Sequence, residues 1–574
     1  MNLLGLTTMG ESAAAFLRDG RVLFAAEEER YSRVKHHVGF PHQAMSDGLA
    51  RTGLTLEDID HVCHYWQPWI LGHRIGHTLS VGIKGLDLFA ARAKRGAKQV
   101  RGHYLPMFFY PFLLRRRAPK AHFTFHYVEH HLSHAASAFF TSPFDEAAIL
   151  SYDGTGESTT TLFAHGRGTT IDVLKRIKLP HSIGQFYSAF TNFLGFDMFA
   201  GDEYKVMGMA AWGKPIYADF LLRNVLIPTG DGGFRLDITF LDHHLAKHRR
   251  YPDRAIDVLG APRQPGQPIL QRHFDIAASV QAATERVTFH MLAHLAKLTG
   301  TRNLCVTGGV ALNSLLNGKI EANSPFQHLW FHPASNDAGG ALGAALYVWH
   351  SKLHNPRGPA LDHAYLGPSY DLARCRAAAQ KAGLTVHPLT EEQTIAKAAD
   401  LLAQGQILGW FMGEMEWGPR ALGHRSFLAD PRRAEMKDLI NEQIKLREPF
   451  RPFAPSLIEE ASVEYFGRPI QAPFMIQVFD VLPEKRAEIP AVVHADGTAR
   501  PQTVARATNP RYWKLISEFG RRTGVPLVLN TSFNVQEPIV NTPEDAVATF
   551  KKTGVQHLFL ETLHVTKPSS ESAR

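Results

Sequence analysis

The stretch EHHLSHAASAFF, residues 129–140, places three histidines within five positions. His130 and His134 are four residues apart, so on a helix they share one face and their imidazoles can converge on a point. This pattern fits a metal site, and it also fits a buried helix whose histidines serve packing; the spacing alone leaves both interpretations open. A metalloprotease is disfavoured, because His131 stands where the HExxH motif requires glutamate.

Two aspartates could complete such a site. Asp153 follows an apolar stretch in YDGTG, and Asp337 lies in SNDAGG before a run of small residues. Two imidazoles and two carboxylates suit a borderline divalent ion such as iron, zinc or manganese, with positions left open for a substrate. We therefore predict a metal site formed by His130, His134, Asp153 and Asp337.

A second group of candidates consists of basic residues that no amphipathic pattern explains. They recur beside glycine, proline and small polar residues in the C-terminal part: Arg420, Arg425, Lys445, Arg447, Arg451 and Arg500. Loops of this composition typically bind anions, because arginine offers bidentate donors to phosphate or carboxylate. A single member could be a surface ion pair, but the set predicts an anion-binding site.

The elements that must position these residues have an α/β pattern. The N-terminus predicts a three-stranded meander over residues 2–29, with a turn at Asp19-Gly20. A long helix is predicted from Asp275 to Thr299. Glycine turns after strands occur in DGTGES, TGGVALN and SNDAGGALG, and such turns are typical of phosphate sites. Three of them after a β-meander indicate the actin/Hsp70-like ATPase fold.

Length and composition limit the remaining classes. A chain of 574 residues predicts more than one domain, and the proline-containing shift near residues 352–363 predicts a boundary. Three scattered cysteines exclude a disulfide scaffold and favour a reducing cytoplasm. No basic segment precedes an apolar leader, and the most apolar window, residues 104–114, is about half of a bilayer span. We therefore expect a cytoplasmic protein without membrane association.

A set of motifs runs in order through nearly the whole chain: EEERYSRVKHHVGFP, HHLSHAASAF, YDGTGE, EYKVMGMAAWG, TGGVALNSLLNGK, NDAGGALGAAL, GPRALGHRS, REPFRPFAPS, DGTARPQTV and LNTSFNVQEPIVNTPEDA. With these motifs the chain resembles the O-carbamoyltransferases of antibiotic and nodulation-factor biosynthesis, a group that includes cephem, nodulation-factor and aminoglycoside carbamoyltransferases. The resemblance implies that residues 1–357 form a metal-containing domain like the catalytic subunit of tRNA threonylcarbamoyl transferase. It implies that residues 358–574 form a YrdC-like α/β domain that makes carbamoyl-adenylate from carbamoyl phosphate and ATP.

The resemblance also implies roles for residues at matching positions. It implies catalytic roles for His130, Asp153, Lys445 and Arg451. It implies nucleotide contacts from Lys205, Gly308, Gly309, Asn313 and Asp337. It implies carbamoyl phosphate or adenylate binding by Arg420, Lys445, Arg451, Arg500, Ser532 and Asn534. The expected metal is Fe²⁺, with Zn²⁺ or Mn²⁺ as alternatives, and ATP is expected as a substrate with Mg²⁺.

The loop after the first predicted strand departs from the family. Family members usually carry a histidine followed by an acid there, whereas this loop reads TTMGESAAA, with Gly10 and Glu11. Glu11, or the pair Lys35-His36, is expected to take over contact with the acceptor, and we assign Glu11 and Lys35 to that role. The acceptor itself is expected to be a hydroxylated small-molecule natural product of the antibiotic type.

Two other functions stay open: a threonylcarbamoyl-type tRNA-modification enzyme, and an actin-like ATPase or sugar kinase with structural histidines. The hydrogenase-maturation class is excluded, because three scattered cysteines cannot build its zinc fingers. The formal charge of +8 owes much to one basic region: Arg92, Lys94, Arg95, Lys98, Arg101, Arg115, Arg116, Arg117 and Lys120. No base-reading motif accompanies it, so we expect no specific nucleic-acid partner and an insertion that helps to cover the acceptor cleft. A homodimer is left open.

Overall fold

The computed structural model describes residues 1–70, 104–241, 251–448 and 450–568. The chain forms two compact units: unit 1 comprises Met1–Glu28 and His36–Leu361, and unit 2 comprises Glu29–Lys35 and Asp362–Arg574. Five members of the basic region lie outside the described residues: Arg92, Lys94, Arg95, Lys98 and Arg101. In the described ranges, no helix combines the length and the apolar character that a bilayer span requires.

Unit 1 contains two five-stranded sheets, and the first has the order β3-β2-β1-β4-β5. Its strands are β1 (Asn2–Thr7), β2 (Ala13–Arg18), β3 (Arg21–Glu27), β4 (His61–His64) and β5 (Thr124–Tyr127). The first three strands pair antiparallel, whereas β1, β4 and β5 run parallel. The predicted meander is confirmed, and the Asp19-Gly20 turn has the positive φ angles, 50° and 79°, that a tight hairpin needs.

The second sheet, of order β12-β11-β6-β7-β8, repeats this topology. Its strands are β6 (Glu146–Tyr152), β7 (Thr159–Arg167), β8 (Thr170–Lys178), β11 (Asn303–Thr307) and β12 (His328–Phe331). Again three strands form an antiparallel meander, and two more extend it in parallel from the first. A meander extended by two parallel strands, present twice, is the architecture of actin/Hsp70-like ATPases, so that prediction is confirmed.

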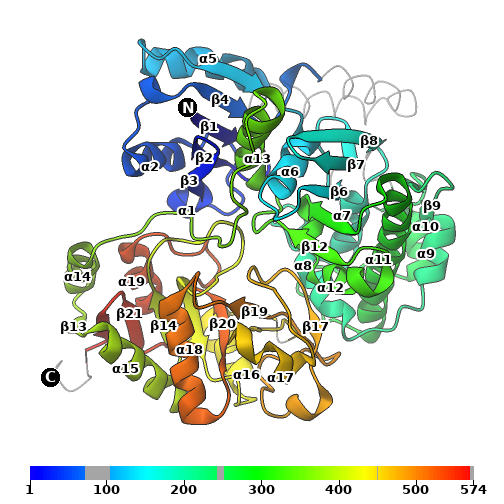
Figure 1. Ribbon diagram of the computed structural model, residues 1–574. Helices are drawn as coiled ribbons and strands as arrows, with labels where there is room; N and C mark the ends of the chain where they lie inside the picture. Colours follow the sequence, from blue (N-terminus) through cyan, green and yellow to red (C-terminus); the bar gives the residue numbers. More distant parts are fainter. Residues whose placement is uncertain (71–103, 242–250, 449, 569–574) are drawn as a thin grey trace. The chain divides into compact units, whose positions relative to one another are not determined.

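Two helices pack tightly at the centre of unit 1 (Figure 1). Helix α6 (His130–Phe139) follows β5, and α13 (Gly339–Tyr347) follows β12. A Cβ atom at Gly343 of α13 would lie 1.8 Å from the carbonyl oxygen of Ser133 in α6. A Cβ at Gly5 of β1 would lie 1.9 Å from the carbonyl oxygen of Ala341. Glycine therefore permits the close approach that holds α6, α13 and β1 together.

The other helices of unit 1 surround these sheets: α2 (His42–Thr52), α5 (Leu105–Arg117), α7 (Ile183–Phe193), α8 (Glu203–Ala210), α9 (Ala218–Asn224), α10 (Asp253–Leu259), α11 (Gln271–Thr299) and α12 (Ser314–Asn323). A small ribbon pairs β9 (Leu226–Pro228) with β10 (Phe234–Leu236). The predicted long helix is α11; it begins four residues earlier than expected and ends before Gly300, which adopts the left-handed conformation.

Unit 2 is built on one mixed sheet of order β13-β22-β21-β14-β15-β20-β16-β19. Its strands are β13 (Thr385–Pro388), β14 (Leu408–Phe411), β15 (Arg425–Ala429), β16 (Ala454–Ile458), β19 (Gln502–Val504), β20 (Leu527–Ser532), β21 (His557–Leu560) and β22 (Leu563–Thr566). Its longer helices are α14 (Leu372–Lys381), α15 (Glu391–Ala403), α18 (Pro510–Thr523) and α19 (Pro543–Lys552), beside the short α16 (Met436–Ile440) and α17 (Ser462–Phe466). The expected α/β class is confirmed.

Helices cover both faces of this sheet. Phe411 and Phe427 belong to an apolar cluster with residues of α14 and α19, while their neighbours Trp410 and Leu428 belong to a second cluster with α15 and α18. Successive residues of a strand point to opposite faces, so the sheet is buried between two helical layers.

The short segment Glu29–Lys35 belongs to unit 2, although it interrupts unit 1 in sequence. The Arg30 guanidinium donates to the carbonyl of Gly418 at 2.7 Å. Arg33 donates to the carbonyls of Pro538 and Ile539 at 2.6 and 2.7 Å. The motif EEERYSRVK thus includes a segment, with helix α1 (Glu29–Ser32), that is anchored on two loops of unit 2.

Candidate functional site

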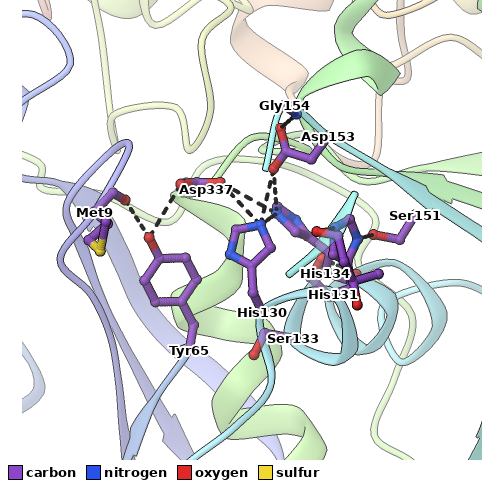
Figure 2. A network of polar contacts seen from close by, with 12 residues as sticks. Met9, Tyr65, His130, His131, Ser133, His134, Ser151, Asp153, Gly154 and Asp337 are labelled. Carbon is purple, nitrogen blue, oxygen red and sulfur yellow. Dashed lines mark hydrogen bonds and ion pairs between the residues drawn. The ribbon is translucent and has the colours of Figure 1, made fainter. Parts of the chain in front are cut away.

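The four predicted metal ligands converge in unit 1 (Figure 2). The Nε2 atoms of His130 and His134 lie 3.2 Å apart on α6, and both side chains are fully buried. An oxygen of Asp153, directly after β6, lies 3.1 and 3.3 Å from these nitrogens. An oxygen of Asp337, in the loop before α13, lies 3.7 and 3.5 Å from them. One donor atom from each residue falls within a cluster 4.8 Å across.

Neighbouring groups orient these ligands. The Tyr65 hydroxyl donates to the carbonyl of Met9 at 2.5 Å and to Asp337 at 3.3 Å, and the amide of Gly154 donates to Asp153 at 2.6 Å. Hydrogen bonds to the outer oxygens of ligating carboxylates are typical of metal sites. Tyr65 therefore contributes to the site, although nothing in its sequence surroundings singles it out.

Glu157 fixes the start of α6. Its carboxylate accepts from the main-chain amide of His130 at 3.1 and 3.3 Å and from the amide of Gln67 at 3.0 Å. Burial raises the pKa of Glu157 to about 7, against the opposing effect of these hydrogen bonds. These hydrogen bonds satisfy a main-chain amide at the start of α6 and set the position of the first ligand. Glu157 lies in the motif YDGTGE, but its function depends on a helix more than twenty residues earlier.

The electrostatics of the cluster match a cation site. Burial raises the pKa of Asp337, and the charge of Asp153 adds to this, giving about 8. Burial would lower the pKa of His134, but hydrogen bonds with Asp153 and Asp337 outweigh it and raise the pKa to about 9. The pKa of Asp153 falls well below its usual value, because His130 and His134 outweigh the effect of burial. Protons thus occupy the metal-free cluster, and a bound cation would replace them.

His131, the third histidine of the stretch, has a structural position. Its Nε2 donates to the carbonyl of Thr159 at 3.1 Å, since a carbonyl can only accept, and its Nδ1 lies 2.8 Å from the hydroxyl of Ser151. Burial lowers its pKa well below the usual value. Both ring nitrogens are used within the fold, so the opening stretch combines two ligands with one packing histidine.

The donor set fits a transition metal. Two imidazoles and two carboxylates favour such an ion over magnesium, which prefers oxygen ligands alone. Tyr65 and Gly154 orient the two carboxylates, and the close packing of α6 on α13 holds the helix that carries both imidazoles. His130, His134, Asp153 and Asp337 are thus the residues that would hold the metal.

The glycine turn at Gly308-Gly309 adjoins this cluster. Gly308 has φ +90°, and a Cβ there would lie 2.2 Å from the carbonyl oxygen of Tyr152. A Cβ at Gly309 would lie 2.8 Å from a carboxylate oxygen of Asp153. The turn therefore lies against the loop that carries a metal ligand, where a phosphate could reach its amides.

The other two predicted nucleotide contacts have partners within unit 1. The Asn313 side chain caps α12 at the amide of Leu316 and exchanges two hydrogen bonds with Gln281, at 2.9 and 3.1 Å. Lys205 forms an ion pair with Asp202 at 3.0 Å and lies over the ring of Phe196. Contact of either residue with a nucleotide stays a prediction.

In unit 2, three predicted residues meet around one ammonium group. Lys445, 3% exposed, donates to the carbonyls of Ser532 and Asn534 at 2.5 and 2.8 Å and to the side chain of Asn534 at 2.8 Å. Ser532 donates to the Asn534 side chain at 2.7 Å. Burial, followed by the charges of Arg447 and Arg451, lowers the pKa of Lys445 well below its usual value.

Two predicted arginines, Arg420 and Arg500, lie within electrostatic reach of Arg451. Arg420 and Arg500 have no hydrogen-bond acceptor or ion-pair partner in the part of the chain that the structure describes, and the Nε atom of each is buried. Burial lowers the pKa of both, to about 10 for Arg420, and the charges of neighbouring arginines, including Arg451, lower it further. Partly buried guanidinium groups that lack acceptors and repel one another favour the binding of an anion, and the anion site itself stays a prediction.

Arg425 takes a different position from that expected, whereas the assignment of Lys35 to the acceptor stays a prediction. Arg425 is fully buried and donates to the carbonyls of Met412, Pro368 and Gly413, so it holds loops together. Lys35 belongs to unit 2, where its charge helps to lower the pKa of Lys445 after burial and two arginines. Glu11 lies in unit 1 beside His36, with 3.1 Å between a carboxylate oxygen and Nδ1. The two residues assigned to the acceptor thus belong to different units.

Comparison with known proteins completes the description. The family model described as "Carbamoyltransferase N-terminus" matches residues 2–346, and that described as "Carbamoyltransferase C-terminus" matches residues 399–567. An uncharacterized protein of Synechocystis is 39% identical over 99% of this chain and 97% of its own. Nodulation protein NolNO of Sinorhizobium fredii is 38% identical over 98% of this chain and 79% of its own.

Among solved structures, HypF of T. kodakarensis is similar over 62% of this chain and 48% of its own, with 15% identity and a TM-score of 0.32, which is too distant to bear on function. The two family models, by contrast, cover most of both units and include the four residues of the metal cluster and the predicted anion-binding residues. The chain belongs to the carbamoyltransferase family and is a carbamoyltransferase.

Proposed function

We propose that the protein is an ATP-dependent O-carbamoyltransferase that works in two half-reactions. Unit 2 makes carbamoyl-adenylate from carbamoyl phosphate and ATP, as a YrdC-like domain would. Unit 1 transfers the carbamoyl group from the adenylate to a hydroxyl of a small-molecule natural product. The observation that carries this proposal is the pair of partly buried guanidinium groups, Arg420 and Arg500, whose buried Nε atoms have no acceptor among the described residues.

The first half-reaction needs a site for several phosphates. Hydrolysis of carbamoyl phosphate gives carbamate and phosphate, and a carbamate oxygen then attacks the α-phosphorus of ATP and releases pyrophosphate. Lys445, Arg451 and Arg500 would neutralise the charge that develops on the phosphoryl oxygens. Lys445 is held by carbonyl and side-chain acceptors of Ser532 and Asn534, so its charge would be in position before the substrates bind.

The second half-reaction attaches the acceptor. The acceptor oxygen attacks the carbamoyl carbon, AMP leaves with the electron pair of the broken bond, and the hydroxyl proton passes to a base. His130, His134, Asp153 and Asp337 would hold the metal, for which Fe²⁺ is favoured over Zn²⁺ or Mn²⁺. When bound, such an ion supplies Lewis-acid polarisation of a carbamoyl or phosphate oxygen. The turn at Gly308-Gly309 would bind the adenylate phosphate through its amides.

Fusion of both steps in one chain suits the chemistry, because carbamoyl-adenylate hydrolyses readily in water. Loops on a rigid scaffold typically determine which acceptor such an enzyme binds. Antibiotic-type secondary metabolites are the class that the sequence resemblance favours. The protein would act in the cytoplasm and without a specific nucleic-acid partner.

Mass spectrometry tests the proposal directly. The purified protein is incubated with ATP, carbamoyl phosphate, Mg²⁺ and a panel of amino sugars, oligosaccharides and cephems. The expected result is pyrophosphate release that requires both substrates, together with a gain of one carbamoyl group by a panel member. Release of ADP without any need for carbamoyl phosphate would instead indicate an ATPase or kinase, and carbamoylation confined to tRNA would indicate a tRNA-modifying enzyme.

A further inference from the structure

A carboxylate–imidazole pair lies next to the metal cluster of unit 1. Glu11 follows Gly10, and a Cβ atom at Gly10 would lie 1.9 Å from an oxygen of the ligand Asp337. The carboxylate of Glu11 lies 3.1 Å from Nδ1 of His36, and Nε2 of His36 lies 3.1 Å from the carbonyl oxygen of Ala200. Burial raises the pKa of Asp337 and of Tyr65, and the charge of Glu11 adds to both shifts, so Glu11 lies within electrostatic reach of the cluster.

The fold holds this pair in a defined position. The loop of residues 36–39 is joined to the β1–β2 hairpin by three hydrogen bonds. The amide of Ser12 donates to the carbonyl of His37 at 2.9 Å, its hydroxyl donates to the carbonyl of Gly39 at 2.6 Å, and the amide of Gly39 donates to the carbonyl of Thr8 at 3.0 Å. His36 itself has φ +50°, a left-handed conformation that is uncommon for a residue with a side chain. Such local strain persists only where the surroundings fix it, and it occurs often at functional sites.

The hydrogen bonds determine how many protons the pair carries. The carbonyl of Ala200 can only accept, so Nε2 of His36 must donate its proton there. A neutral His36 would then present a lone pair at Nδ1 to the carboxylate of Glu11, which would be repulsive. The contact at 3.1 Å therefore requires one more proton, which lies between Nδ1 of His36 and Oε1 of Glu11.

Because Oε1 of Glu11 is paired with His36, Oε2 is the carboxyl oxygen that can accept a hydrogen bond from another group. Its side chain is 19% exposed, and within the described part of the chain Oε2 has no hydrogen-bond partner. Oε2 is thus a hydrogen-bond acceptor beside a metal cluster, on a partly exposed side chain that is held in place through its other oxygen.

We propose that Glu11 is the carboxylate that binds the hydroxyl of the acceptor and takes its proton, and that His36 is its positioning residue. The inference rests on the proposed function and adds the missing base to its second half-reaction. As the acceptor oxygen bonds to the carbamoyl carbon and the bond to AMP breaks, the hydroxyl proton moves to Oε2 of Glu11 and is later released to water. His36 keeps its own protons throughout and holds Oε1.

Substitution of Glu11 separates this role from a structural one. Glu11→Gln keeps the size of the side chain and removes its capacity to take a proton. With the acceptor identified in the panel, we expect kcat for transfer to fall by about 100-fold or more, as is typical for loss of a general base. The KM for the acceptor should change little, and pyrophosphate release should continue. Glu57→Gln, on an exposed residue of unit 1, is the matched control.

Chemical rescue makes the test decisive. Glu11→Ala should lose transfer and regain part of it in the presence of formate, a small carboxylate that can occupy the vacated space. His36→Ala should lower kcat for transfer by about tenfold without rescue by formate, because it releases Glu11 but leaves its carboxylate in place. Transfer by Glu11→Gln within about twofold of the unaltered protein, or failure of formate to rescue Glu11→Ala, would overturn the inference. An unaltered protein that releases no pyrophosphate would overturn the proposed function itself.

Discussion

The two sheets of unit 1 share one topology, yet their first hairpins have different uses. Each second strand is preceded by the same three residues, Gly-Glu-Ser: residues 10–12 before β2 and residues 156–158 before β7. Glu157 is 3% exposed and caps α6 through the amide of His130, whereas Glu11 is partly exposed and pairs with His36. The glutamate of this tripeptide therefore supports the metal site in the second sheet's half of unit 1, where it is Glu157. In the first sheet's half it is Glu11, which is partly exposed beside that site.

The connections from β5 to α6 and from β12 to α13 also differ between the two halves of unit 1. Only two residues separate β5 from α6, so the first turns of the helix itself carry His130 and His134. Seven residues separate β12 from α13, and Asp337 lies on that loop. One half thus supplies imidazoles from a rigid helix, and the other supplies carboxylates from turns. A duplicated fold can place unlike ligands on both sides of one point because each half changes its connections and keeps its strands.

Removal of an imidazole should have the largest effect. We expect His134→Ala to lose the bound metal and to lower transfer by more than about 100-fold, because loss of a ligand should exceed the usual cost of losing an orienting contact. Pyrophosphate release by unit 2 should remain. Metal analysis of the purified protein and the two half-reaction assays measure this, with the exposed His122→Ala as the control. Retention of about one metal ion per chain by His134→Ala would show that the histidines serve packing.

Replacement of Gly10 and Gly156, the first residues of the two Gly-Glu-Ser stretches, with alanine should have unequal effects on metal affinity. A Cβ at Gly10 would lie 1.9 Å from Asp337 in a residue with φ +68°, whereas a Cβ at Gly156 would meet its nearest neighbours, His130 and His131, at 3.0 and 3.1 Å. Gly10→Ala should therefore displace Asp337 and weaken metal binding by about tenfold or more, while Gly156→Ala should have a smaller effect. Competition with a chromogenic chelator measures both affinities.

Gly53 offers a matched control for the backbone. It has nearly the same φ angle as Gly10, +67°, and a Cβ there would meet nothing within 4 Å. Gly53→Ala should cost about 1 kcal/mol of stability without any change in metal affinity. Equal metal affinities for the Gly10 and Gly53 variants would mean that the loop can move away from Asp337.

Much of this arrangement follows from local sequence patterns. His130 and His134 are predictable because helical spacing places them on one face, and Asp153 and Asp337 because both follow strands at glycine turns. The duplicated fold follows from repeated strand–turn–helix units. Each of these signals is contained within a few neighbouring residues, which explains why they can be read without tertiary information.

Other features depend on distant contacts. Arg30 and Arg33 bind carbonyls about 390 and 505 residues further along the chain, so nothing local reveals that their segment belongs to unit 2. Arg425 and Arg420 occur in one motif, but only burial against carbonyls shows that Arg425 is structural. Tyr65 and Glu157 act on the ligands through the fold, and a single sequence gives no measure of such proximity.

Metal binding should depend strongly on pH because two of the four ligands hold protons at neutral pH. Asp337, with a pKa of about 8, and His134, with a pKa of about 9, must each lose a proton before they can bind a cation. Apparent metal affinity should rise by about tenfold or more per unit between pH 6 and pH 8. Metal titrations at several pH values measure this slope, and it should become shallower in Asp337→Asn. A slope that is the same in both proteins would place the competing protons elsewhere.

The smallest effect should come from Glu157→Gln, which keeps the helix cap but removes its charge. The carboxyl has a pKa of about 7 in the folded protein and a usual value near 4.5, so the folded state binds the extra proton between these values. Its favourable contribution is complete below pH 4.5 and is lost as the pH rises through 7. Because glutamine is always neutral, the variant should have the same melting temperature as the unaltered protein near pH 5. At pH 8 it should melt about 2 °C higher. Melting curves of metal-saturated protein at both pH values test this, since other titrating groups are common to the two proteins. If Glu157→Gln instead melted below the unaltered protein at pH 8, the ionised carboxylate would be stabilising α6. The glutamates of the two hairpins would then differ only in how exposed they are.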